Sequence, residues 1–121
     1  MTAGRILLVE DALGISRALG RALSLSQGDE FSVESCDRAE LAVEYLQERS
    51  FDLLITDLRL PGMSGLELLE WAQRSCPELR SILITAYGTP QLEEQARRLT
   101  DAYLPKPFRL NDLLRLVRVV L

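Results

Sequence analysis

The stretch ILLVED, residues 6–11, places two acids directly after four consecutive apolar residues. An apolar run without polar alternation is typical of a strand that is buried on both faces, as in a parallel sheet. Similar runs recur along the chain, separated by longer segments of helical periodicity. The sequence therefore predicts five strands, at residues 6–9, 31–35, 53–56, 81–84 and 102–104.

The first segment between strands predicts an amphipathic helix from about Ala12 to Leu25. Its apolar residues recur at the spacing that puts them on one face: Ile15, Leu19, Ala22 and Leu23. We expect this face to pack against the sheet, since such a stripe is buried in most globular proteins. Gly28 is expected to mark the end of the helix.

Residue pairs suited to helix N-termini mark three further helices: Asp37 with Glu40, Ser64 with Glu67, and Thr89 with Pro90. In the first two pairs an N-cap side chain is followed three residues later by a glutamate, and in the third a proline takes the first helical position. The helix that begins at Pro90 has the fewest apolar residues, so we expect it to be the most loosely held. A last helix is expected at residues 110–121.

Alternating strands and helices predict an α/β fold, a doubly wound five-stranded parallel sheet of the flavodoxin-like order 2-1-3-4-5. The 121 residues, 47% of them apolar, suit one domain over residues 1–121 with one hydrophobic core. No run approaches the roughly 18 apolar residues of a membrane-spanning helix, and the start of the chain does not resemble a signal peptide. We therefore expect a cytoplasmic protein without a membrane partner.

Composition argues against several classes of function. The net charge is −4 and the basic residues are scattered, which argues against direct binding of nucleic acid. The chain has no histidine, and Cys36 and Cys76 lie far apart in the sequence, so neither a zinc site nor a CxxC redox motif can be assembled. We expect both cysteines to be reduced.

Reactive side chains follow four of the five predicted strands. Glu10 and Asp11 follow the first, Asp57 the third and Thr85 the fourth, and Lys106 comes shortly after the fifth. Ligands of open parallel sheets bind at the carboxyl ends of the strands, so we expect these side chains to lie together. Three adjacent carboxylates repel one another unless a cation is present, and oxygen ligands favour Mg²⁺. A carboxylate nucleophile, a divalent cation, a hydroxyl and an ammonium are the components of phosphoryl transfer.

Each of these residues taken alone also has an ordinary structural interpretation. Glu10 and Asp11 could cap the first helix, Asp57 could be a loop acid, and Lys106 could be a solvated surface charge. Their joint placement at one sheet edge favours the functional interpretation.

Four motifs, in this order and at this spacing, resemble the receiver domain of bacterial two-component response regulators: LLVED at 7–11, ITDLRLPGMSG at 55–65, ITAYG at 84–88 and YLPKPF at 103–108. The resemblance extends over essentially the whole chain. It implies a signalling switch in which Asp57 accepts a phosphoryl group, bonded by Thr85 and paired with Lys106. Such a domain catalyses only its own phosphorylation and dephosphorylation.

The resemblance also implies the metal ligands and the moving parts. Mg²⁺ would be held by Asp11, Asp57, the backbone carbonyl of Arg59 and, mainly through water, Glu10. Tyr103 would act with Thr85 as the switch, and a cis peptide bond would precede Pro107.

By the same resemblance, a sensor histidine kinase is the partner, because a chain without histidine cannot carry the phosphohistidine donor. Signalling would run through the face of the fourth helix, fifth strand and fifth helix, to an output domain of a longer transcriptional regulator or to a downstream protein. That face could also form a homodimer on phosphorylation.

Two positions depart from the family pattern: Leu99-Thr100 stands where Gly-Ala is common, and Arg109 stands where a capping residue is common. The alternatives are a docking module that is not phosphorylated and a hydrolase of the same sheet type.

Overall fold

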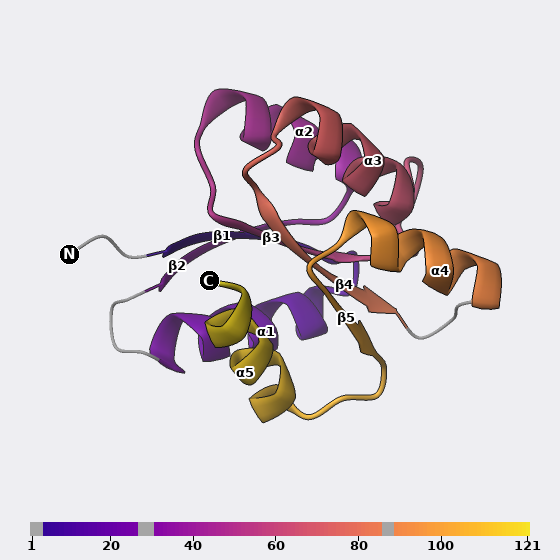
Figure 1. Cartoon of the computed structure of the whole chain (residues 1–121). Helices are drawn as coiled ribbons and strands as arrows, with labels where there is room; N and C mark the ends of the chain where they lie inside the picture. Colours follow the sequence, from indigo (N-terminus) through magenta and orange to yellow (C-terminus); the bar gives the residue numbers. More distant parts are fainter. Residues whose placement is uncertain (1–3, 27–30, 86–88) are drawn as a thin grey trace.

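A computed structural model describes residues 4–26, 31–85 and 89–121. Its parallel sheet has the strand order β2-β1-β3-β4-β5, which confirms the predicted topology (Figure 1). The strands are β1 (Gly4–Val9), β2 (Phe31–Cys36), β3 (Leu53–Asp57), β4 (Arg80–Thr85) and β5 (Ala102–Pro105). The end of the first helix expected at Gly28 lies outside the described residues.

Helices cover both faces of the sheet, as a doubly wound fold requires (Figure 1). One face carries α1 (Leu13–Ser26) and α5 (Leu110–Val120), and the other carries α2 (Ala39–Glu48), α3 (Gly65–Ser75) and α4 (Pro90–Leu99). No helix among the described residues is long and apolar enough to cross a membrane.

Two apolar layers, one on each face of the sheet, form the core. Leu7 and Val9 of β1 pack in the layer under α2 and α3, whereas Ile6 and Leu8 pack in the layer under α1 and α5. All four side chains are fully buried. Because successive residues of a strand point to opposite faces, a strand covered on both sides needs an unbroken apolar run.

The helix starts predicted for α3 and α4 are confirmed. The Ser64 hydroxyl accepts a hydrogen bond from the Glu67 N–H at 3.1 Å, and the Glu67 carboxylate accepts one from the Ser64 N–H at 3.0 Å. At α4 the Thr89 hydroxyl accepts from the Leu92 N–H at 3.2 Å, and Pro90 occupies the first turn.

The start predicted for α2 is wrong. Arg38 occupies the N-cap position and makes no side-chain cap, while Asp37 pairs with the Arg38 guanidinium at 3.1 Å. The Glu40 carboxylate instead accepts a hydrogen bond from the Met63 N–H at 2.9 Å, in the loop between β3 and α3. The Glu40 side chain, which the local pattern assigned to the N-terminus of α2, is therefore used in a contact between distant segments of the chain.

Both departures from the family pattern have local compensation. At the end of α4, the Thr100 hydroxyl donates to the Ala96 carbonyl at 2.7 Å, which satisfies a helix-end acceptor without a glycine. At the start of α5, the Asp112 carboxylate accepts from the Arg109 N–H at 3.3 Å. This carboxylate supplies the negative charge that a helix N-terminus favours.

The α1 stripe is only partly buried, so the prediction for Ile15 is wrong. Leu19 and Leu23 are buried as expected, but Ile15 is 41% exposed. Ile15 lines a groove of about 600 Å³ with Phe108 and Leu110 from the segment that leads into α5. The first turn of α1 therefore presents an apolar side chain to this groove rather than to the core.

Candidate functional site

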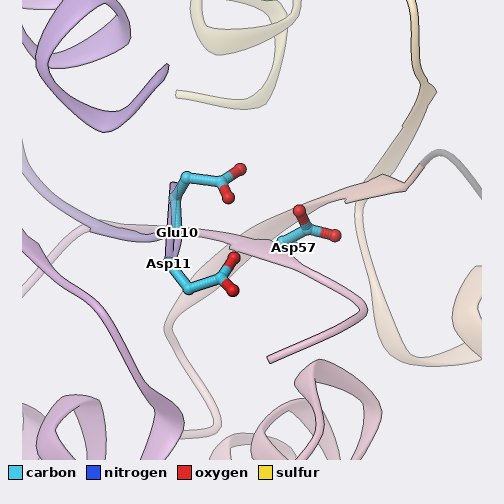
Figure 2. Close-up of side chains that lie close together, drawn as sticks. All are labelled: Glu10, Asp11 and Asp57. Carbon is cyan, nitrogen blue, oxygen red and sulfur yellow. The ribbon is translucent and has the colours of Figure 1, made fainter. Parts of the chain in front are cut away.

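Strand register brings the predicted site residues to one edge of the sheet. Val9 of β1 is paired with Thr56 of β3, so the residues that follow in each strand, Glu10 and Asp57, emerge side by side. Figure 2 shows Glu10 and Asp11 extending from the end of β1 beside Asp57 on β3. The parallel sheet thus places acids from two distant parts of the chain together.

The three acids form a compact cluster of unequal burial. One carboxylate oxygen from each of Glu10, Asp11 and Asp57 lies within 4.8 Å of the others. Glu10 and Asp57 are 4% and 7% exposed, whereas Asp11 is exposed to solvent. Together with Thr85 and Lys106, they line a cavity of about 240 Å³.

Lys106 neutralises part of this negative charge. Its ammonium donates to Asp57 Oδ2 at 2.7 Å and to Glu10 Oε2 at 3.1 Å. Burial lowers the pKa of Lys106, but the hydrogen bonds that its ammonium donates to the two carboxylates outweigh this effect and raise the pKa overall. The side chain therefore stays protonated and links the ends of β1, β3 and β5.

Glu10 is held at an electrostatic cost. Burial raises the pKa of its carboxyl, and this effect exceeds the opposing hydrogen bonds from the Ala12 N–H and from Lys106. The nearby Asp57 charge raises it further. Three carboxylates face one ammonium, so the cluster keeps an excess of negative charge. This oxygen-rich donor set fits a hard divalent cation such as Mg²⁺.

Asp57 is oriented by its surroundings. Its Oδ2 binds Lys106, while Oδ1 accepts a weak hydrogen bond from the Arg59 N–H at 3.3 Å. The following residue, Leu58, donates its N–H to the Ile84 carbonyl at 3.0 Å, which ties the end of β3 to β4. The carboxylate therefore projects from a rigid strand end into the cavity.

The two predicted switch residues lie on neighbouring strands but are not brought together at the cavity. Thr85 ends β4, is 2% exposed and lines the cavity. Tyr103 on β5 is partly buried, and its hydroxyl donates to Glu93 Oε1 of α4 at 3.2 Å. The peptide bond between Lys106 and Pro107 is cis.

Sequence reasoning missed two residues that act on the site through the backbone or through a neighbour. Glu93 was not singled out from the sequence, yet its carboxylate accepts a hydrogen bond from the Tyr103 hydroxyl. Gly65 starts α3 so close to β3 that a Cβ atom there would overlap the Asp57 carbonyl oxygen. The position of Gly65 at the end of the motif ITDLRLPGMSG could have indicated its role. Nothing in the sequence distinguishes Glu93 from the neighbouring Glu94.

The fold and the acidic cluster define a receiver-type signalling domain. Residues 6–118 match the response regulator receiver domain family, and the chain belongs to this family. Receiver domains are signalling switches that bind Mg²⁺ at an acidic pocket, and the cluster of Glu10, Asp11 and Asp57 fits that pocket.

Three similar proteins illustrate the range of the family. The response regulator FleR of Pseudomonas aeruginosa is 40% identical over 95% of this chain, which spans 24% of FleR. The receiver protein CpdR of Brucella abortus is 36% identical over 97% of this chain and 96% of its own length. The solved structure of TrrA from Thermotoga maritima, in complex with Mg²⁺ and BeF, has a TM-score of 0.87 and 27% identity, covering 98% of this chain and 99% of TrrA.

Proposed function

We propose that Asp57 accepts a phosphoryl group and that the domain acts as a phosphorylation-dependent switch. The observation that carries this proposal is the placement of Asp57 itself. Its carboxylate is nearly buried, is bonded by the only lysine of the chain, and faces a cavity shared with two further acids and Thr85. A carboxylate held in this way can act as a nucleophile toward a phosphorus atom that enters the cavity.

In the transfer step, an Asp57 carboxylate oxygen forms a bond to phosphorus while the phosphorus–nitrogen bond of a phosphohistidine donor breaks. The electron pair goes to the imidazole, which leaves and takes up a proton, and an acyl phosphate remains on Asp57. Among the described residues, the Lys106 ammonium and the Thr85 hydroxyl line the cavity and can bond the transferred oxygens.

Mg²⁺ would supply charge neutralisation between the anionic donor and the acidic cluster. Asp11 and Asp57 would hold it directly, the backbone carbonyl of Arg59 would be a third protein ligand, and Glu10 would act mainly through water. The cavity is lined by all four residues, which supports this assignment.

A sensor histidine kinase is the proposed donor, since the chain has no histidine of its own. FleR is about four times as long as the segment that this chain matches, which supports a place within a longer transcriptional response regulator. We propose that the face formed by α4, β5 and α5 transmits the signal, to an output domain or downstream protein or through a homodimer.

Intact-mass spectrometry after incubation with acetyl phosphate and Mg²⁺ tests the phosphoacceptor. We expect one phosphoryl adduct on the parent chain and none on Asp57→Asn or in the presence of a chelator. An adduct that persists on Asp57→Asn would show that another residue is the phosphoacceptor. Mg²⁺ binding without any adduct would favour the docking module that is not phosphorylated.

The groove beside the cavity supports docking of the kinase at this edge of the molecule. Its lining is almost entirely apolar, and it lies next to Lys106, so a helix that fills it would bring a phosphohistidine toward Asp57. Leu110 lines the groove but not the phosphoryl cavity, and it is 41% exposed. We expect Leu110→Arg to slow phosphotransfer from a phosphorylated sensor kinase that labels the parent chain, by about tenfold or more. Labelling by acetyl phosphate should remain unchanged, because the small donor needs no docking surface.

Val119→Arg is the matched control for this experiment. Val119 is 76% exposed on α5 and does not line the groove. Equal slowing by both substitutions would show that added positive charge, rather than the groove, affects the kinase. An unchanged rate for Leu110→Arg would place the docking surface elsewhere.

A further inference from the structure

Two consecutive acids in the first half of α4 have different environments. Glu93 is partly buried, and its Oε1 accepts the hydrogen bond from the Tyr103 hydroxyl at 3.2 Å. Glu94 is exposed and pairs with Arg98 one turn later at 3.4 Å. The first acid therefore faces β5, and the second faces solvent.

Tyr103 and Thr85 lie on the same face of the sheet. The register partner of Tyr103 on β4 is Leu83, and both pack in the core layer under α2, α3 and α4. Thr85 is two residues further along β4, so it points to the same side as Leu83. A tyrosine ring at position 103 can thus turn along this face toward the phosphoryl site or, as observed, toward α4.

The far end of α4 is tied to the start of β4. The Ser81 hydroxyl donates to the Leu99 carbonyl at 3.4 Å, and the Ser81 N–H donates to the Asp101 carboxylate at 2.9 Å. Within the helix, Ala96 is the buried residue. The hydrogen bond between Tyr103 and Glu93 therefore joins the other half of α4 to the sheet, at a helix whose apolar anchoring is small.

We infer that Glu93 is a positioning residue that holds Tyr103 against α4 in the unphosphorylated domain, so that the phosphorylated state forms in competition with this hydrogen bond. The inference rests on the proposed function, because it requires Tyr103 to leave α4 when the Asp57 site is occupied. Burial and the neighbouring Glu93 carboxylate raise the pKa of Tyr103, so the hydroxyl keeps the proton that it donates.

Competition of this kind has a measurable consequence for a ligand that mimics the phosphoryl group. Such a ligand binds the state in which Tyr103 is released, and its apparent affinity falls with the fraction of molecules in that state. A hydrogen bond to a charged, partly exposed acceptor is worth about a fivefold shift in this equilibrium. Removing the bond should therefore tighten binding.

The test is the affinity of the chain for beryllium fluoride in the presence of Mg²⁺, measured by isothermal titration calorimetry. We expect Glu93→Ala to bind about fivefold tighter than the parent. Glu94→Ala is the matched control and should bind like the parent, since it removes a neighbouring charge but not the contact. Glu93→Gln keeps an acceptor oxygen and should restore most of the parental affinity.

A second pair of variants separates the hydrogen bond from other effects of the substitution. Tyr103→Phe keeps the ring and removes the donor, so it should tighten binding about as much as Glu93→Ala. The double variant Glu93→Ala with Tyr103→Phe should then bind no tighter than either single variant, because both remove the same bond.

Three outcomes would overturn the inference. Parental affinity in Glu93→Ala would show that the bond does not restrain the switch, and additive gains in the double variant would show that the two residues act independently. If the parent bound Mg²⁺ but no beryllium fluoride, the proposed function itself would fail, and the inference with it. In the first two outcomes the parent still binds beryllium fluoride, so only the inference fails.

Discussion

Replacing Gly65 with alanine is expected to destabilise the domain by about 3 kcal/mol, which is the upper part of the usual cost of overpacking. Gly65 begins α3 directly against the end of β3, where its N–H donates to the Leu58 carbonyl at 2.8 Å. A Cβ atom would overlap the Asp57 carbonyl oxygen and would lie 2.9 Å from the Leu58 Cα. Both neighbours are backbone, so relief requires the strand end or the helix start to move.

The same movement should affect the function of the site, because Asp57 is the residue that would be displaced. We expect Gly65→Ala to lower the midpoint of urea unfolding and to slow phosphorylation by acetyl phosphate. Gly14→Ala is the matched control. Gly14 lies in the first turn of α1, and a Cβ atom there meets no atom within 4 Å. That substitution should leave the stability unchanged or raise it slightly, by less than the roughly 0.5–1 kcal/mol of a helix interior, because Gly14 lies in the first turn. Equal stabilities of the two variants would contradict the close approach at Gly65.

The fold was predictable from the sequence because a doubly covered parallel sheet leaves a strong pattern. The run of residues 6–9 has to be apolar on both faces, and every side chain in it is buried. Strand ends were less predictable, since Gly4 and Arg5 precede the apolar run and still belong to β1, where they are paired with Phe31 and Ser32. Pairing between distant segments, and not local composition alone, therefore extends such a strand beyond its apolar run.

Much of the site was predictable for a related reason. Residues that follow parallel strands must emerge at one edge, so the proximity of Glu10, Asp57 and Lys106 follows from the strand order. The partners of other acids were not predictable in this way. Glu40 and Glu93 bind the Met63 N–H and the Tyr103 hydroxyl, and both contacts depend on how a helix packs against a loop or a strand. Helical periodicity marks a face but does not identify its partner.

Replacing Lys106 with methionine is expected to have the second large effect, a loss of about 3 kcal/mol of stability in the absence of divalent cations. The ammonium is bonded to two nearly buried carboxylates, at 2.7 Å and 3.1 Å, and its side chain is 20% exposed. Methionine can fill similar space but leaves Glu10 and Asp57 facing each other without a cation. The estimate takes the lower end of the cost of breaking a buried ion pair, because solvent reaches the lysine.

Addition of Mg²⁺ should reverse part of this loss. A divalent cation in the acidic cluster would replace the missing positive charge. Mg²⁺ stabilises the parent as well, so at saturation the difference shrinks by the ratio of the two dissociation constants, about 1.4 kcal/mol for a variant that binds tenfold tighter. We therefore expect the stability difference between Lys106→Met and the parent, measured by urea unfolding, to be large with a chelator and smaller at saturating Mg²⁺. The variant should also bind Mg²⁺ more tightly, because the cation no longer competes with the ammonium for the same oxygens.

Asp57→Asn provides the control that ties this effect to charge. The asparagine removes one of the two carboxylates that Lys106 neutralises, so a methionine at position 106 should cost less in the Asp57→Asn background than in the parent. Equal costs in both backgrounds would mean that Lys106 stabilises the domain through packing of its aliphatic stem. If Lys106→Met were as stable as the parent in the presence of a chelator, solvent rather than the lysine would already screen the repulsion within the cluster. Since Lys106 holds the ends of β1 and β3 together across the cavity, we expect the stability of this edge of the sheet to depend on the same ammonium that is proposed to pair with the phosphoryl group on Asp57.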